Sequence, residues 1–588
     1  MKRSIPFVLA LLASFPSVGQ TFQDAYGTLN YEVISAQEGT CRVTGASSPA
    51  IATAIIPAEV THNNVTYKVM EIGDGAFAGC TDLTHLETAA SDLPIKFGHD
   101  ALKDVELTTV VLGRDFTCSV NDEPFDNMSS ITSLSFGSGV TRIPSFWFHG
   151  TKNLKSVRIS GKIESIGVAA FDNSGLTSVT IDSQYLTTIG SEAFQGCPLS
   201  TVSLPASLKY IGDAAFASTS LSSITIPAGV ISIGRNAFSN CTSLGSFTVA
   251  SGNKTFASSQ GLLYTYGYEK LLQVPANKRP VYFHSNMKEI GEYAFNGCNV
   301  LFVNVPEGVT SIGEQAFRNC RKMTSVTLPE SLTKVGAGAF TYCTALTTIN
   351  FPSGLTAIPD EAFLGAGLKT LELPSTITSI GAKAFSICPS LASVTVPGSV
   401  TSMGSGVFMN CNKLTSATLG EGIGFITESM FSGCSLLADI TIPQSVAVIE
   451  NSAFAGCSAI KEVRLPEWLE KIGDNAFSGV NLTGVYSVAT KPGTLSASSF
   501  SNKTFLAGTL YVPVGLKAVY QAAPVWRLFS NIVESEELSA IDGVTADDET
   551  AVRVYNLQGV LIYSGEKSDM PALPAGIYLI NGRKIYIR

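Results

Sequence analysis

The chain has 588 residues, of which 45% are hydrophobic and only 14% are charged. Its 32 Phe residues are part of an apolar content large enough to fill a core, which excludes disorder for most of the chain. Lys and Arg number 38 against 47 Asp and Glu, so the net charge is −9, and without a basic cluster a nucleic-acid partner is excluded. At about 150 residues per domain, the length alone suggests about four domains.

The N-terminus has the features of a secretory signal peptide, residues 1–19. Lys2 and Arg3 precede an apolar run at 5–15, and the small residues at 17–19 form a cleavage site. That run is too short to span a bilayer, which takes about 20 residues, and no other run of about 18 apolar residues occurs. We therefore expect no transmembrane span, and a protein that is secreted or at the outer cell surface after cleavage. A buried N-terminal strand is the alternative interpretation of residues 5–15.

A regular spacing of Phe organises residues 65–504. Counting Phe77 and Leu102 in the same position, the chain has 18 turns, and from Phe125 onward each step is 22 or 23 residues except the step from Phe238 to Phe295. Periods of 20–50 residues are typical of solenoids, in which each unit buries its apolar face only against its neighbours. The column continues through Phe148, Phe171, Phe194, Phe216 and Phe238, then from Phe295 through Phe317, Phe340, Phe363, Phe385, Phe408, Phe431, Phe454, Phe477 and Phe500. Residues 20–64, which precede these repeats, are predicted to form an N-terminal cap.

One unit, CRKMTSVTLPESLTKVGAGAFTYC, runs from Cys320 to Cys343. Its stretch 324–328 alternates and is rich in β-branched residues, which predicts a short strand. Pro329 ends the strand because proline has no N–H to donate to a ladder. Stacked units then place their Leu, Val, Ile and Phe residues in one continuous core.

A glycine stands four residues before the Phe in eleven turns. Pro144 and Pro359 occupy the same position in other turns, and proline fixes φ near −65°, so the position does not demand a left-handed backbone. We predict instead that tight packing against the neighbouring turn selects glycine. The eleven are Gly73, Gly167, Gly190, Gly212, Gly234, Gly291, Gly313, Gly336, Gly381, Gly404 and Gly473.

The pattern LxxVxLPxxLxxIGxxAFxxC, repeated over about residues 65–505, resembles the BspA-like class of leucine-rich repeats of bacterial and protist surface proteins. The resemblance implies a repeat solenoid, a right-handed superhelix with parallel β-strands on one face. It also implies secretion or placement at the cell surface, with binding or adhesion as the usual role. Residues 250–288 depart from the repeat, and two apolar runs around residues 265–269 predict a hairpin inserted into one turn.

The C-terminal part differs from the repeats. Residues 505–533 contain one strand and a helix-like stretch with Val519, Tyr520, Trp526 and Phe529, which we predict to cap the core of the last turn. Residues 534–550 are acidic without a basic residue, which is typical of a solvated linker. Residues 551–588 contain three short β runs, and the blocks VYNLQG, LPAGIYLI and KIYIR resemble the C-terminal sorting domain of the type IX secretion system. A plain β-rich tail is the alternative.

Ten of the twelve Cys stand three residues after a Phe of the repeat. In an exported protein, this pattern suggests disulfides between neighbouring turns. Met128, Thr151, Ser174 and Ala366 occupy the same position elsewhere, so it selects a small buried side chain, and we predict free buried thiols. Cys41 and Cys118 lie outside this column, and the pattern does not predict whether they are free thiols. The ten are Cys80, Cys197, Cys241, Cys298, Cys320, Cys343, Cys388, Cys411, Cys434 and Cys457.

Residue patterns of enzymes are scarce in this chain. The five His form no metal-ligand spacing, and no nucleophile elbow, P-loop or dinucleotide fingerprint occurs. We therefore expect no cofactor, no metal and no catalysis, while a catalytic pair formed across distant turns stays open. The five are His62, His85, His99, His149 and His284.

The outward strand positions are the first place to look for a binding surface. Most are Ser or Thr, either because Thr suits an exposed strand or because hydroxyls bind an extended partner. Charged and aromatic residues interrupt them in adjoining turns, and we predict a ligand-binding cluster of Asp439, Glu462, Arg464 and Tyr486. A second candidate is an aromatic patch in the insertion with Tyr264, Tyr266, Tyr268, Tyr282 and Phe283, for which packing in the core or cap is the alternative.

Together these features predict an exported, monomeric, non-enzymatic surface protein. We expect it to bind an extracellular protein through the solenoid, in the manner of an adhesin. A carbohydrate-binding or nutrient-capture surface protein is the alternative. The sequence does not name the ligand, because strand-face residues vary without changing the fold.

Overall fold

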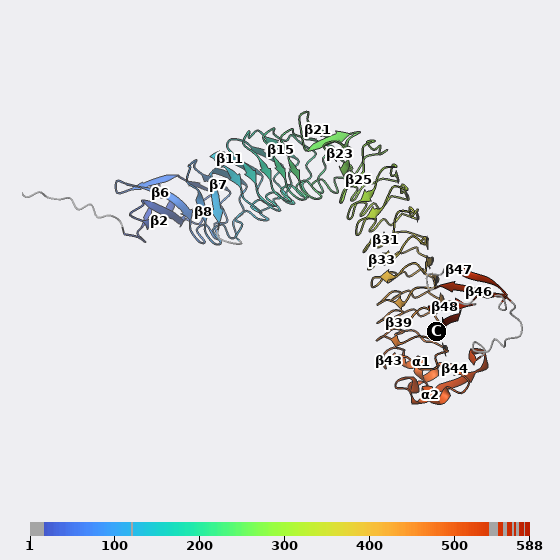
Figure 1. Cartoon of the computed structure of the whole chain (residues 1–588). Helices are drawn as coiled ribbons and strands as arrows, with labels where there is room; N and C mark the ends of the chain where they lie inside the picture. Colours follow the sequence, from blue (N-terminus) through green and yellow to red (C-terminus); the bar gives the residue numbers. More distant parts are fainter. Residues whose placement is uncertain are drawn as a thin grey trace, which may run out of the picture. The chain divides into compact units, whose positions relative to one another are not determined.

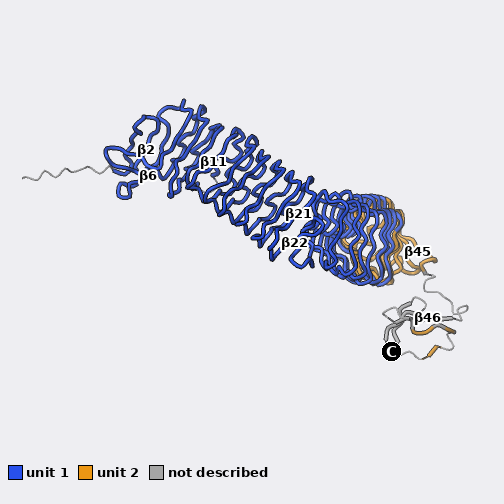
Figure 2. The backbone as a smooth tube through the Cα atoms, turned by 90° about the horizontal axis from the view of Figure 1, so that it is seen from above, with its two compact units in different colours: residues 1–423, 427–439 blue, residues 424–426, 440–588 orange. Residues whose placement is uncertain are grey.

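The computed structural model describes residues 17–118, 122–539, 551–556, 561–566, 570–571, 576–580 and 583–587. The chain forms two compact units: residues 1–423 with 427–439, and residues 424–426 with 440–588 (Figure 2). The predicted signal peptide up to residue 16 and residues 540–550 of the predicted linker lie outside the described residues.

The turns of the solenoid carry two parallel columns of strands (Figure 1). In the turn that contains Phe340, the first-column strand is β28 (Ser325–Thr327), as predicted, and a second strand, β29 (Lys334–Val335), follows after the proline corner. Strands of successive turns pair in register, so that equivalent residues lie side by side. The second strand was not predicted, because two residues carry no alternation pattern.

The first unit contains most of both columns. The first column comprises β4 (Thr53–Ile56), β7 (His85–Thr88), β9 (Thr109–Arg114), β11 (Ser133–Gly139), β13 (Ser156–Ile159), β15 (Ser178–Ile181), β17 (Thr201–Val202), β19 (Ser223–Ile226), β21 (Ser246–Val249), β26 (Phe302–Asn304), β28, β30 (Thr348–Ile349), β32 (Thr370–Glu372), β34 (Ser393–Val396) and β36 (Ser416–Leu419). The second column comprises β6 (Val65–Ile72), β8 (Ile95–Phe97), β10 (Phe116–Cys118), β12 (Arg142–Ile143), β14 (Ser165–Ile166), β16 (Thr188–Ile189), β18 (Tyr210–Ile211), β20 (Ser232–Ile233), β25 (Glu289–Ile290), β27 (Ser311–Ile312), β29, β31 (Ala357–Ile358), β33 (Ser379–Ile380) and β35 (Ser402–Met403). β38 (Asp439–Thr441) spans the division between the units.

The N-terminal residues extend the second column. β1 (Thr21–Gln23), β2 (Leu29–Ser35) and β3 (Thr40–Ala46) pair antiparallel in sequence order, and β3 then pairs in parallel with β6. β5 (Glu59–His62) forms an antiparallel hairpin with β6. β4 pairs in parallel with β7, so the first column begins inside the segment predicted as the N-terminal cap.

The insertion at residues 250–288 forms a small antiparallel sheet. β22 (Phe256–Ser259) pairs with β23 (Leu262–Thr265), and β23 pairs with β24 (Lys270–Gln273). β24 then pairs in parallel with β25. The inserted hairpin therefore ends on a strand that rejoins the second column.

The column of Phe side chains forms the centre of the core. From Phe125 to Phe238 and from Phe295 to Phe431, successive rings are stacked with centroids 4.5–5.7 Å apart and planes within 20° of parallel. These rings are buried, which removes a large apolar area from water in every turn. The Phe spacing in the sequence is thus the spacing of two ring stacks in the unit, one on each side of the insertion.

Close approach of neighbouring turns explains the glycine four residues before the Phe in eleven of the turns. A Cβ on Gly190 would lie 2.6 Å from the carbonyl carbon of Gly167 in the preceding turn, closer than real Cβ atoms come. The left-handed backbone lies elsewhere, two residues before and two residues after the Phe, as at Gln315 and Asn319 around Phe317. The expectation that packing selects this glycine is therefore confirmed.

The second unit ends both columns. Its second column comprises β37 (Phe425–Ile426), β39 (Val448–Ile449), β41 (Lys471–Ile472) and β43 (Thr494–Leu495), and its first column β40 (Glu462–Leu465), β42 (Gly484–Ser487), β44 (Thr509–Pro513) and β45 (Asn531–Ser535). The connections contain α1 (Asn502–Ala507), α2 (Lys517–Ala522) and the 3-10 helix η1 (Trp526–Leu528). Tyr520, Trp526 and Phe529 from this predicted capping segment are buried, whereas Val519 is exposed.

The segment after β45 begins with secondary structure. β45 includes Glu534 and Ser535, and α3 (Glu536–Ser539) follows directly, so the first residues of the predicted linker belong to the second unit's fold. The C-terminal residues form an antiparallel sheet in the order β47-β46-β48-β49, one strand more than predicted. Its strands are β46 (Ala551–Asn556), β47 (Leu561–Glu566), β48 (Gly576–Ile580) and β49 (Arg583–Ile587).

Candidate ligand-binding surface

The outward residues of the first column form a surface of hydroxyl groups in the first unit. Strands such as β34 and β36 alternate buried and accessible positions, with Thr395 and Thr418 exposed side by side. This alternation follows from the pleat, which sends successive side chains to opposite faces. Most of this face therefore offers hydrogen-bonding groups but no anchoring side chain.

Three planar side chains stand on this column in the second unit. The guanidinium carbon of Arg464 lies 4.6 Å from the centroid of the Tyr486 ring. The Tyr486 ring in turn is stacked on Tyr511, with centroids 4.6 Å apart and planes 8° from parallel. Strand register produces this arrangement, because Arg464 pairs with Tyr486 across β40 and β42, and Tyr486 pairs with Tyr511 across β42 and β44. We call these three residues the aromatic–arginine stack.

Carboxylates flank the stack. Nη2 of Arg464 lies 3.2 Å from Oε1 of Glu537 in α3. Burial raises the pKa of the Tyr486 phenol, and the nearby carboxylate of Glu462 raises it further. The phenol therefore stays neutral at physiological pH, which keeps it a hydrogen-bond donor.

The structure brings together three of the four residues predicted on this face. Glu462, Arg464 and Tyr486 lie on neighbouring strands of the second unit, whereas Asp439 is an exposed residue of the first unit. Tyr511 was missed because it lies in the segment assigned to the C-terminal cap. The strand-like residues 509–513 were the available indication that the column continues there.

The aromatic residues of the insertion do not form one exposed patch. Tyr264 is fully buried, and its hydroxyl oxygen accepts a hydrogen bond from the His284 N–H at 3.2 Å, so its prediction as a surface residue is wrong. The reason is the place of β23 between β22 and β24, where three consecutive residues of the strand are buried. Tyr268 is half-buried and stacked on the His284 ring at 4.0 Å, and Tyr266 is exposed.

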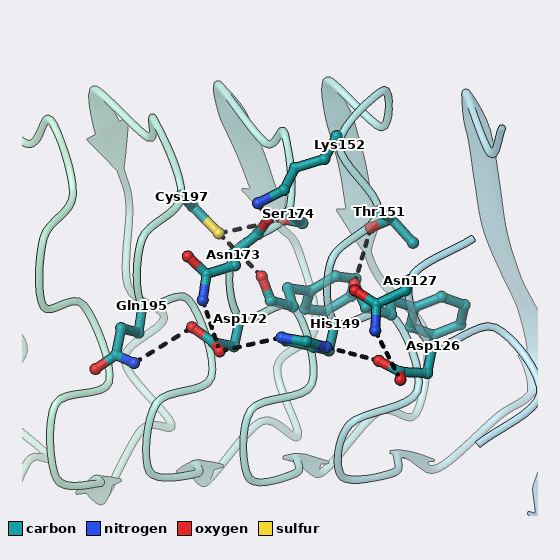
Figure 3. A network of polar contacts seen from close by, with 12 residues as sticks. Asp126, Asn127, His149, Thr151, Lys152, Asp172, Asn173, Ser174, Gln195 and Cys197 are labelled. Carbon is teal, nitrogen blue, oxygen red and sulfur yellow. Dashed lines mark hydrogen bonds and ion pairs between the residues drawn. The ribbon is translucent and has the colours of Figure 1, made fainter. Parts of the chain in front are cut away.

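A polar network accompanies the Phe column in the turns between residues 126 and 197 (Figure 3). His149 lies between two carboxylates of the adjacent turns, with Nδ1 2.6 Å from Asp126 Oδ1 and Nε2 3.5 Å from Asp172 Oδ2. The nearby Cys197 thiol has its pKa raised to about 11 by burial, so it is protonated at neutral pH. Because both ring nitrogens face carboxylates and the thiol is not ionised, this network links turns but supplies no activated nucleophile.

The described part of the chain contains neither a metal-binding group nor a membrane-spanning helix. Within residues 17–118, 122–539 and the described C-terminal strands, no group of three or more His, Cys, Asp or Glu residues is placed to hold a metal ion. No helix among the same residues is long and apolar enough to cross a bilayer. All twelve cysteines are described, and none forms a disulfide.

The parallel strand columns, the stacked core and the 22–23-residue repeat define a leucine-rich-repeat solenoid. The model of the BspA type Leucine rich repeat region matches residues 58–177, 164–260, 276–392 and 378–507, which is more than half of the chain. The chain therefore belongs to the family of proteins with BspA-type leucine-rich repeats, as the repeat pattern predicted. No curated protein matches it.

Solved structures of leucine-rich-repeat proteins are similar to the chain. A leucine rich cell surface protein from Faecalibacterium prausnitzii is 24% identical, with 68% of this chain and 94% of that chain covered and a TM-score of 0.40. A leucine-rich repeat protein from Bacteroides ovatus is 22% identical, with coverage of 78% and 93% and a TM-score of 0.29. The pneumococcal vaccine antigen PcpA is 17% identical, with coverage of 88% and 100% and a TM-score of 0.33.

Proposed function

We propose that the protein is an exported, non-enzymatic surface protein that binds an extracellular protein through the first strand column, in the manner of an adhesin. Membership of the BspA-type family supports a binding role, since repeat solenoids present extended surfaces. Export by a signal peptide at residues 1–19 and use of residues 551–588 as a type IX sorting domain are parts of the proposal. So is the monomeric state of the protein.

The aromatic–arginine stack is the observation that carries this proposal. The residues that contribute most binding energy in protein interfaces are enriched in Tyr and Arg. A tyrosine ring offers a large contact area with few rotatable bonds, and arginine offers a planar set of hydrogen-bond donors. Arg464 and Tyr486 are held in place by their stacking, so little further order is lost when a partner binds. The surrounding hydroxyl surface supplies hydrogen bonds around this centre.

A carbohydrate-binding or nutrient-capture role is the second candidate. Flat aromatic rings are suited to contact with sugar rings, and Tyr486 and Tyr511 form a stacked pair on the strand face. Tyr266 in the insertion adds an exposed aromatic side chain at a separate place in the first unit. The two roles predict different ligands for the first strand column, a protein in one case and a carbohydrate in the other.

A binding screen distinguishes these roles. The purified protein without residues 1–19 is applied to immobilised extracellular-matrix proteins and to a glycan array. We expect saturable protein binding that Arg464→Ala and Tyr486→Ala each weaken by about tenfold or more, the effect of a hot-spot residue. Arg158→Ala is the matched control, because Arg158 is also an outward arginine of the first column, paired with Asp182.

Each other outcome points to a different conclusion. Binding to glycans alone supports the carbohydrate role. Loss of binding on deletion of residues 250–288, with the two stack variants unaffected, moves the site to the insertion. No binding to either panel, or turnover of a bound ligand, contradicts the proposal.

A further inference from the structure

The helix α3 lies beside the aromatic–arginine stack although it is far from Arg464 in the sequence. It follows β45 directly and packs against β44, the strand that carries Tyr511. Its Leu538 is buried, and its Glu537 reaches Arg464 on β40. The chain thus places one of its own carboxylates at the surface that we propose for partner binding.

Stacking leaves the hydrogen-bonding edge of Arg464 available. A guanidinium carries five N–H donors in its plane, and contact with an aromatic face uses the plane rather than the donors. A single nitrogen–oxygen pair, Nη2 to Oε1 at 3.2 Å, joins Arg464 to Glu537. A carboxylate that approached in the plane of the guanidinium would form two parallel hydrogen bonds instead of one.

The internal ion pair is weak enough to be replaced. The side chains of Arg464 and Glu537 are 59% and 72% exposed. Exposed pairs contribute about 0–1 kcal/mol because water and salt screen them. A partner that offers a better placed carboxylate therefore competes at little cost.

We propose that the aromatic–arginine stack binds a carboxylate-bearing segment of a protein partner, and that Glu537 occupies this position in the free protein. The inference rests on the proposed function and names the partner's chemistry, a Glu or Asp side chain. Glu537 is the internal example of such a carboxylate. Charge complementarity supports it, because Arg464 is the cation of the stack.

Glu462 limits which acidic segments fit. It lies two residues before Arg464 on the same face of β40, so a second carboxylate on the partner would meet a like charge. A partner carboxylate at the one position that faces Glu462 is therefore disfavoured.

The test uses fluorescein-labelled peptides as probes for the full-length protein, with binding followed by fluorescence anisotropy. One peptide, ESEELS, has the sequence of residues 534–539, and its control, ESEQLS, lacks the central carboxylate. We expect Glu537→Gln to bind ESEELS about two- to fivefold more tightly than the unaltered protein, the gain from removing an exposed ion pair. We expect ESEQLS to bind more weakly to both proteins, and Arg464→Lys to bind ESEELS more weakly because lysine lacks the planar donor pair.

Three results would overturn the inference. These are equal affinity for the two peptides, equal affinity of the Glu537→Gln variant and the unaltered protein for ESEELS, and no binding of either peptide. A partner from the binding screen separates this inference from the proposed function. If Tyr486→Ala abolishes partner binding but Glu537→Gln leaves it unchanged, the binding role stands and the carboxylate inference fails.

Discussion

The thiol of Cys343 donates a hydrogen bond to the main-chain carbonyl oxygen of Phe317 in the preceding turn, with 3.1 Å between sulfur and oxygen. Six further cysteines of the column make the same contact at 3.1–3.3 Å: Cys197, Cys241, Cys320, Cys388, Cys411 and Cys434. The cysteine column therefore satisfies main-chain acceptors between turns. It does not cross-link the turns.

This contact predicts twelve free thiols per chain. Titration with a thiol reagent in denaturant, without a reductant, measures them, and a count of ten or fewer would contradict the absence of disulfides. In the native protein at pH 8 we expect the buried thiols to react slowly with the reagent. With a pKa of about 11, about one Cys197 side chain in a thousand is a thiolate at that pH.

The Phe stack predicts a large loss of stability when one ring is removed. Phe340 is fully buried between Phe317 and Phe363, and Phe340→Ala should lower the free energy of unfolding by about 3–5 kcal/mol. Phe302→Ala is the matched control, because this ring is 68% exposed and its removal should change stability by less than about 0.5 kcal/mol. Urea denaturation measures both, and equal effects would contradict the stack as the centre of the core.

The contact between Gly190 and Gly167 predicts that even a methyl group is not tolerated there. Gly190→Ala should destabilise the protein by about 1–3 kcal/mol, because main chain rather than a movable side chain blocks the Cβ. At Gly245 the nearest atom to an added Cβ would be the Ser222 carbonyl oxygen at 3.8 Å, an ordinary contact. Thermal unfolding should thus show a lower Tm for Gly190→Ala and almost no change for Gly245→Ala.

The burial of the Tyr520 phenol predicts that the protein loses stability at alkaline pH. Burial raises its pKa from 10.0 to about 12, so the folded state holds the phenolic proton more tightly than the unfolded state does. Its stabilising contribution is complete below pH 10 and is lost as the pH rises from 10 to 12, by roughly 2–3 kcal/mol in all.

The comparison with Tyr520→Phe isolates this effect. The variant loses the hydroxyl contacts to Ser487 and the Ala489 carbonyl and should be less stable at pH 8 by about 1 kcal/mol or more. Its stability should fall less steeply between pH 10 and 12. Urea denaturation at pH 8, 10 and 11 measures how the free energy of unfolding of each protein changes with pH. An equal decrease in the two proteins would contradict the raised pKa of Tyr520.

Local patterns predicted the solenoid well because they repeat. The strand at 324–328, the proline corner and the Phe spacing each follow from properties of single residues, and repetition made them certain. The second strand column and the left-handed residues beside each Phe were not predictable in the same way. Gln315 and Asn319 adopt a positive φ because the packed turn demands it, since a left-handed backbone is unfavourable for a non-glycine residue.

The candidate site was predictable only in part. Outward positions on adjacent strands placed Glu462, Arg464 and Tyr486 together, because register carries over from one turn to the next. The pattern of an inserted hairpin does not reveal which of its aromatic residues face inward. For this reason Tyr264 was expected at the surface although it is buried.

The sequence by itself determined that residues 65–504 form stacked turns around a shared Phe column rather than several separate domains, because a period of 22–23 residues leaves each repeat an apolar face that only a neighbour can bury. Only the tertiary structure decided which side chains meet on the surface. Tyr511 reaches Tyr486 through the continued strand column, and Glu537 reaches Arg464 because α3 packs back on β44. These contacts join residues distant in the chain, so no local pattern contains them.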